Sequence, residues 1–158
     1  MNRSIEFSDQ DMAMMKEALA EARLAGDAGD VPVGAILTDA DGHIIARGHN
    51  TREIMQTALG HAELSAISNA CSTLGSWRLS GCTLYVTLEP CPMCAGAILH
   101  ARIPRVVYGA SDPVAGAMGS VWAIHRSPAE NRHTRVELGC MEEECRAILK
   151  EFFKSRRE

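Results

Sequence analysis

The chain has 158 residues, of which 46% are hydrophobic and 23% charged, proportions that predict a single compact domain over residues 1–158. No segment approaches the roughly 20 apolar residues of a membrane-spanning helix, and the N-terminus lacks an apolar signal region, so we expect a cytoplasmic protein without a membrane segment. The net charge is −4; residues 1–89 hold 6 basic and 12 acidic side chains, and residues 90–158 hold 10 and 8, a balance that neither requires nor excludes RNA.

The first predicted element is an amphipathic helix. Ser8 and Asp11 form the pattern of a capping box, and apolar residues then recur at helical spacing from Met12 to Ala22. The pattern predicts a helix that ends near Gly26. Its methionines are interpreted as core residues rather than as a partner-binding stripe.

A hairpin and a second helix are expected next. The β-prone segments 31–38 and 43–47 flank the turn-forming residues 39–42, which favours a hairpin. After a polar loop, a helix is predicted through residues 61–70, ending near Gly75. The clearest strand of the sequence follows at residues 82–88.

The remaining segments continue the alternation of helices and strands. Pro92 suits the first turn of a helix, where its missing N–H leaves no partner unpaired. Helices that alternate with strands favour an α/β sandwich around one sheet. The predicted order is a helix, a strand, a loop, a strand and a closing helix, at residues 90–101, 104–108, 109–120, 134–138 and 142–153.

Two short motifs carry the candidate chemistry, and each lies at the predicted start of a helix. His61 and Glu63 belong to the first motif; Cys91 and Cys94 belong to the second. Cysteines three residues apart in a first helical turn can bind one metal ion, and the partial positive charge of a helix N-terminus favours their thiolate forms. With His61 they supply three ligands, which predicts one zinc ion per chain with an open position for water.

Glu63 is the candidate proton carrier. Two residues apart on the flank of a helix, His61 and Glu63 would point in different directions. At a helix tip, however, a metal beyond the N-terminus can be approached from several sides. His61 can then bind the metal while Glu63 reaches the water, provided that the helix starts there.

Other interpretations of the cysteines remain open. Cys91 and Cys94 could be a redox pair, or half of a structural zinc site completed by Cys140 and Cys145. A non-enzymatic, zinc-stabilised binding module is also possible, although such a module needs no proton carrier. The cysteines outside the second motif are most simply buried thiols, namely Cys71, Cys82, Cys140 and Cys145.

The combination of both motifs resembles the signature of the cytidine-deaminase-like zinc hydrolases, which deaminate nucleic-acid bases. More specifically, the chain resembles the bacterial tRNA-specific adenosine deaminases. The resemblance implies a three-layer α/β/α sandwich around one central mixed sheet of about five strands. It rests on residues 31–34, 48–50, 83–98, 105–110, 116–120 and 152–157.

The resemblance also implies an activity and a site. It implies the hydrolysis of adenosine to inosine in a tRNA anticodon loop, at the wobble position, with release of ammonia and with Glu63 moving the protons. His61, Cys91 and Cys94 would hold Zn²⁺. Asn50, Ala62 and Asp112 would contact the substrate, although Asn50 and Asp112 are also ordinary turn formers. A homodimer is implied as well.

The alternative function is deamination of a free base such as guanine, because guanine deaminases share both motifs. Two features favour RNA instead: the loop of residues 116–120 and the closing helix. The closing segment carries basic and aromatic side chains that could contact RNA, although the aromatics could also pack inward. These are Lys150, Phe152, Phe153, Lys154, Arg156 and Arg157.

Overall fold

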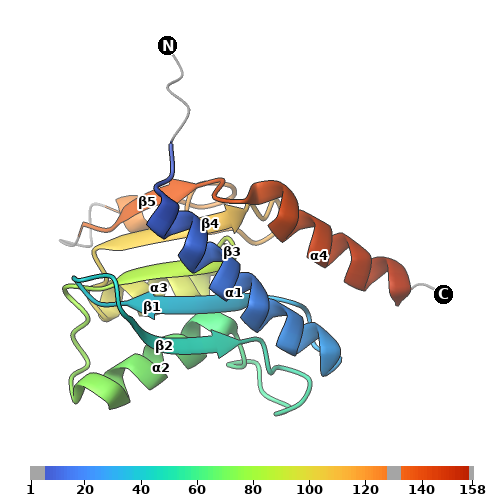
Figure 1. Ribbon diagram of the computed structural model, residues 1–158, viewed down its shortest axis with the longest axis horizontal. Coiled ribbons are helices and arrows are strands. Elements are labelled where there is room, and N and C mark those ends of the chain that lie inside the picture. The colour runs from blue at the N-terminus through green and yellow to red at the C-terminus, as the bar shows by residue number, and fades with distance from the viewer. Residues whose placement is uncertain (1–5, 128–132, 157–158) are drawn as a thin grey trace.

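One five-stranded sheet organises the molecule (Figure 1). The computed structural model describes residues 6–127 and 133–156; Arg157 lies outside them. The helices are α1 (Asp9–Asp27), α2 (Ala62–Leu74), α3 (Pro92–His100), α4 (Glu142–Ser155) and the short 3-10 helix η1 (Ile124–Arg126). The strands are β1 (Gly34–Thr38), β2 (Ile44–His49), β3 (Thr83–Leu88), β4 (Arg105–Ala110) and β5 (Arg135–Leu138).

The sheet is mixed, with the strand order β2-β1-β3-β4-β5. Strand β1 runs antiparallel to both of its neighbours, whereas β3, β4 and β5 are parallel. The end of β2, the start of β1 and the ends of β3 and β4 therefore lie at the same edge of the sheet. That edge carries the site described below.

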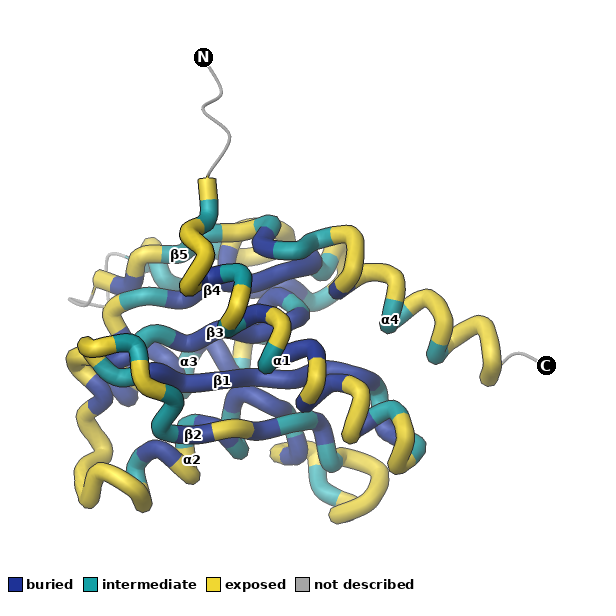
Figure 2. The backbone as a smooth tube through the Cα atoms, in the orientation of Figure 1, coloured by how far each residue is buried: buried dark blue, intermediate teal, exposed yellow. Residues whose placement is uncertain are grey.

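Helices cover both faces of the sheet, which confirms the predicted three-layer α/β/α sandwich. Side chains alternate along β1: Ile36 packs with the core of α1, whereas Ala35 and Leu37 pack with the core of α2 and α3. Figure 1 shows α1 across one face and α2 and α3 on the other. In Figure 2 the central strands are almost wholly buried, as expected for strands enclosed on both sides.

The helix boundaries follow local sequence signals. The predicted capping box is present, with the Ser8 hydroxyl accepting from the Asp11 N–H at 3.0 Å and the Asp11 carboxylate accepting from the Ser8 N–H at 3.3 Å. Helix α2 ends at Gly75, which adopts the left-handed conformation (φ 64°) that glycine tolerates best. Pro92 occupies the first turn of α3.

Several boundaries differ from the prediction. Strand β1 begins at Gly34 rather than at residue 31, since Pro32 has no N–H for the ladder and the Val33 N–H bonds the Val31 carbonyl instead. Helix η1 was not predicted. Helix α4 continues to Ser155 and extends away from the sheet (Figure 1). Of the helices described, none is long and apolar enough to cross a membrane.

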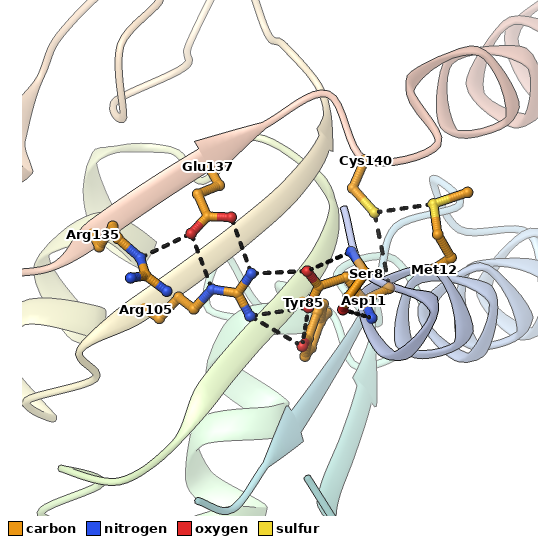
Figure 3. Close-up of polar contacts among 8 residues, drawn as sticks. All are labelled: Ser8, Asp11, Met12, Tyr85, Arg105, Arg135, Glu137 and Cys140. Atoms are coloured by element: carbon orange, nitrogen blue, oxygen red, sulfur yellow. Dashed lines mark hydrogen bonds and ion pairs between the residues drawn. The ribbon is translucent and has the colours of Figure 1, made fainter. Parts of the chain in front are cut away.

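An ion network connects the start of α1 to the sheet (Figure 3). The Arg105 guanidinium donates to both oxygens of Asp11, at 3.0 and 2.9 Å, and to both oxygens of Glu137, at 3.2 and 3.0 Å. The Tyr85 hydroxyl donates to Asp11 at 2.7 Å. Burial alone would raise the pKa of Asp11, but the bonds from Arg105 and Tyr85 outweigh it and lower the pKa to about 2.

Candidate active site

A cavity of about 230 Å³ opens at the sheet edge where β2, β3 and β4 end. Six residues predicted from the sequence line it: Asn50, His61, Ala62, Glu63, Cys91 and Asp112. Cys94, the remaining predicted residue, lies fully buried behind the cavity wall, next to His61. The fold thus gathers all the predicted site residues in one place.

Two helix N-termini bring the candidate metal ligands together. His61 is the N-cap residue of α2, Cys91 is the N-cap residue of α3, and Cys94 lies in the first turn of α3. His61 Nδ1 is 3.6 Å from Cys91 Sγ and 3.5 Å from Cys94 Sγ. Tetrahedral zinc with ordinary Zn–N and Zn–S bonds places such atoms roughly 3.5 Å apart, so the three residues fit a zinc ion.

Charge in the cluster is arranged around one thiolate. A hydrogen bond from the Cys94 thiol lowers the pKa of Cys91 to about 4, and His61 adds to the effect. The same bond raises the pKa of Cys94, as does its burial. The pKa of His61 is raised by its bond with Cys91. Cys91 is therefore a thiolate at neutral pH, the form that binds metals.

Glu63 lies beside the cluster in the first turn of α2. Its side chain lines the cavity although only 4% of the residue is exposed, and burial raises its pKa. Gly48 of β2 allows the first turn of α2 to pack closely against that strand, since a Cβ at Gly48 would lie 2.5 Å from the Ala62 carbonyl oxygen. Helix α2 starts at Ala62, so the helix begins at the His61–Glu63 motif, as the prediction for Glu63 required.

The three predicted substrate contacts also reach the cavity. Asn50 follows β2, and its side-chain oxygen accepts from the Arg52 N–H at 3.3 Å. Asp112 follows β4 and accepts from the N–H groups of Val114 and Ala115, at 3.0 and 3.1 Å. Both residues thus stabilise their own loops while lining the cavity, so the turn-forming role and the cavity position hold together.

Sequence reasoning did not identify half of the cavity lining. Among these residues, Glu89 could have been suspected, because it is a charged residue between an apolar strand and the cysteine motif. Arg52 carries no comparable signal. The unpredicted lining residues are Val31, Val33, Arg52, Leu88, Glu89 and Ala115.

The alternative interpretation, a structural zinc site completed by Cys140 and Cys145, is wrong. Cys140 and Cys145 pack in the core of α1, on the other face of the sheet from α2 and α3. Cys82 is buried as predicted, whereas Cys71 is only half-buried. In the part of the chain that the structure describes, His61, Cys91 and Cys94 form the one group of thiol and imidazole ligands close enough to share a metal.

Comparison with known proteins defines the class. The profile of the MafB19-like deaminase family matches residues 8–157. The molecule is therefore a deaminase with the cytidine-deaminase-like fold.

Individual relatives narrow the class further. A tRNA-specific adenosine deaminase from Bacillus subtilis is 49% identical over 148 residues, covering 94% of this chain and 91% of the relative. A solved structure from work on tRNA:A34 deaminases superposes with a TM-score of 0.83 at 45% identity, covering 87% of this chain and 99% of that one. A guanine deaminase structure from Bacillus subtilis superposes with a TM-score of 0.62 at 33% identity, covering 96% of each chain. The chain belongs to the family of tRNA-specific adenosine deaminases.

Proposed function

We propose that the protein hydrolyses adenosine to inosine in tRNA, at the wobble position of the anticodon. The observation that supports this most strongly is the juxtaposition of the His61, Cys91 and Cys94 ligand atoms with the buried carboxyl group of Glu63 in one cavity. The higher identity to tRNA-specific deaminases than to guanine deaminase favours the RNA substrate over the free base.

One zinc ion per chain is part of the proposal. His61, Cys91 and Cys94 would hold it, because a thiolate-rich set with one imidazole suits zinc and the atoms already lie at suitable separations. When bound, zinc lowers the pKa of a coordinated water to about 7 and so makes a nucleophile available at neutral pH.

Glu63 would carry the protons. Its carboxylate would take one proton from the attacking water and deliver it to the adjacent ring nitrogen of adenine. It would then take the second proton from the oxygen now bonded to C6 and pass it to the amino group, which leaves as ammonia. One residue can serve all of these transfers because they occur within one cavity around the same carbon. Burial of Glu63 suits this task, since it makes the protonated form more accessible than for a carboxyl group in water.

Asn50, Ala62 and Asp112 would bind the nucleoside. The Asn50 amide and the Asp112 carboxylate, which both line the cavity, offer hydrogen bonds to base and sugar, and the start of α2 at Ala62 leaves backbone donors without helical partners. An anticodon base suits a cavity of this kind, since an unpaired loop nucleotide can turn into a pocket at lower cost than a paired one.

A direct assay distinguishes the proposal from the alternative. An anticodon stem-loop with adenosine at the wobble position is incubated with zinc-loaded protein, beside the same stem-loop with guanosine there and beside free guanine. We expect ammonia and inosine from the first substrate only. Efficient deamination of free guanine, with no reaction of the stem-loop, would establish the alternative instead.

A homodimer, which the family resemblance implies, stays a prediction; sedimentation equilibrium measures it directly. Cytoplasmic location and the single domain over residues 1–158 also stay predictions. Contact between α4 and the RNA is part of the proposal.

A further inference from the structure

Glu89 lies in the wall of the cavity, two residues before the metal ligand Cys91. Glu89 follows the last residue of β3 and precedes Pro90 and the metal ligand Cys91. Only 2% of the residue is exposed. Its side chain lines the cavity, yet the proposed chemistry gives it no task.

Both oxygens of this carboxylate hold the loop that follows β4. One oxygen accepts from the Asp112 N–H at 3.0 Å and from the Ser120 hydroxyl. The other accepts from the N–H groups of Met118, at 3.0 Å, and Ser120, at 3.1 Å. Within the described residues these four bonds come from neutral donors of this one loop, and the Tyr108 hydroxyl of β4 also interacts with the carboxylate.

The loop is shaped to receive the carboxylate. A Cβ on Gly116 would lie 2.4 Å from Glu89 Cδ, so only glycine leaves room for the side chain. The backbone adds two bonds, from the Glu89 N–H to the Ala110 carbonyl at 2.9 Å and from the Ala117 N–H to the Pro90 carbonyl at 2.8 Å. The residue thus joins the cysteine motif to both ends of the loop.

A buried carboxylate makes this connection specific. If the loop moves so that its N–H and hydroxyl groups no longer reach Glu89, the carboxylate charge stays buried without hydrogen-bond partners, which is strongly unfavourable. The loop in turn places Asp112 and Ala115 in the cavity wall. The metal ligands and Glu63 lie at the starts of α2 and α3 instead.

We infer that Glu89 is a positioning residue that fixes the substrate-binding loop, residues 111–120, against the metal motif, and so sets affinity for the RNA rather than the rate of the chemical step. It acts through Asp112 and Ala115 and does not touch the reacting atoms. The inference rests on the proposed function, because it assigns the loop a tRNA substrate.

The first test compares Glu89→Gln with Asp11→Asn. Glutamine keeps the volume but turns one acceptor into a donor that faces the donors of the loop. We expect KM for the stem-loop to rise about tenfold or more, with kcat within about threefold and zinc content unchanged, as for loss of binding shared by ground state and transition state. Asp11→Asn disturbs a buried carboxylate on the opposite face of the sheet and should leave both constants unchanged.

The second test reaches the same contact from the loop side. Gly116→Ala displaces the carboxylate without altering it, and should reproduce the rise in KM. The double variant should then show less than the sum of the two effects, because both remove one interaction. Amide hydrogen exchange gives a readout without turnover: exchange at residues 112, 118 and 120 should accelerate in Glu89→Gln, but not in Asp11→Asn.

The outcomes separate this inference from the proposed function. If the wild-type protein does not deaminate the stem-loop, the proposed function fails, while the exchange experiment still tests the loop contact. If the wild-type protein is active and Glu89→Gln retains its KM, the positioning role is refuted. A loss of zinc or a fall in kcat with unchanged KM would also refute it, because Glu89 would then act on the metal site.

Discussion

Glu63 lies two residues after His61, yet both side chains reach one cavity because α2 begins between them. A helix tip offers directions that a helix flank does not. The sequence alone could therefore identify the pair, given a correct helix start. By contrast, the hydrogen bonds of Glu89 join residues more than 20 positions apart, and no local pattern encodes them.

Replacing Glu63 should abolish turnover and leave the metal in place. In Glu63→Gln the side chain can no longer accept and release the protons, and general acid–base contributions are typically 10² to 10⁴-fold, so kcat should fall by at least about that factor. Single-turnover kinetics measure the fall, and elemental analysis should find zinc as in the wild type. Activity within about threefold of wild type would remove Glu63 from the mechanism.

Asp11 should make a contribution to the free energy of unfolding that depends on pH. Its pKa is lowered from 3.8 to about 2, so its contribution is fully present above pH 3.8 and is lost as the pH falls toward 2. The shift corresponds to about 2 kcal/mol. Urea unfolding should find Asp11→Asn less stable by about that amount near neutral pH, with the difference shrinking on acidification. A difference that is constant with pH would contradict the ionic origin.

At the level of elements, most of the fold could be predicted because its signals are local. The capping box, Gly75 and Pro92 set helix ends through backbone chemistry that acts within a few residues. A loop was predicted at residues 109–120, but helix η1 and the way in which residues 111–120 are held could not be predicted, since both depend on contacts with α3 and with Glu89. The exposure of α4 could not be predicted from the sequence either, because its apolar pattern is that of an amphipathic helix packed on a core.

Helix α4 should contribute to RNA binding. Lys150, Lys154 and Arg156 are exposed, Phe153 is 47% exposed, and the Arg156 guanidinium stacks on the half-buried Phe152 ring at 4.6 Å. Removal of residues 154–158, which spares both aromatics, should weaken tRNA binding and lower its salt dependence by about one to two phosphate contacts, with zinc retained.

The matched control removes two exposed cations elsewhere, in the double variant Lys16→Gln and Arg78→Gln. It lowers the net charge without touching α4 and should leave the salt slope near wild type. Equal tRNA affinity and an equal salt slope in the truncated protein would refute the role of the helix.

At the scale of the whole molecule, the sheet topology creates the site. Because β1 runs antiparallel to β2 and β3, residues 31–33 meet Asn50 and Leu88 at one edge, far apart though they are in the sequence. The α2 and α3 N-termini meet at the same edge, on one face of the sheet. The order of the strands is not encoded in any single segment; the family resemblance implied a mixed sheet of about five strands, but not their order.

The same topology predicts one zinc ion per chain. Elemental analysis should find a single equivalent in the wild type and almost none when Cys91→Ala and Cys94→Ala are combined. The group Asp39, Asp41 and His43 on the β1–β2 turn offers a matched control, in which Asp41→Asn should leave the zinc content unchanged. Two equivalents per chain, or full retention in the double cysteine variant, would contradict the assignment.

The most direct measurement is to map inosine in a complete unmodified tRNA pool after incubation with zinc-loaded protein, with Glu63→Gln as the blank. Inosine should arise at the first anticodon position, only in tRNAs that carry adenosine there, and should be absent from the blank. A pool without inosine, treated with protein that holds its zinc, would contradict the assignment of tRNA as the substrate.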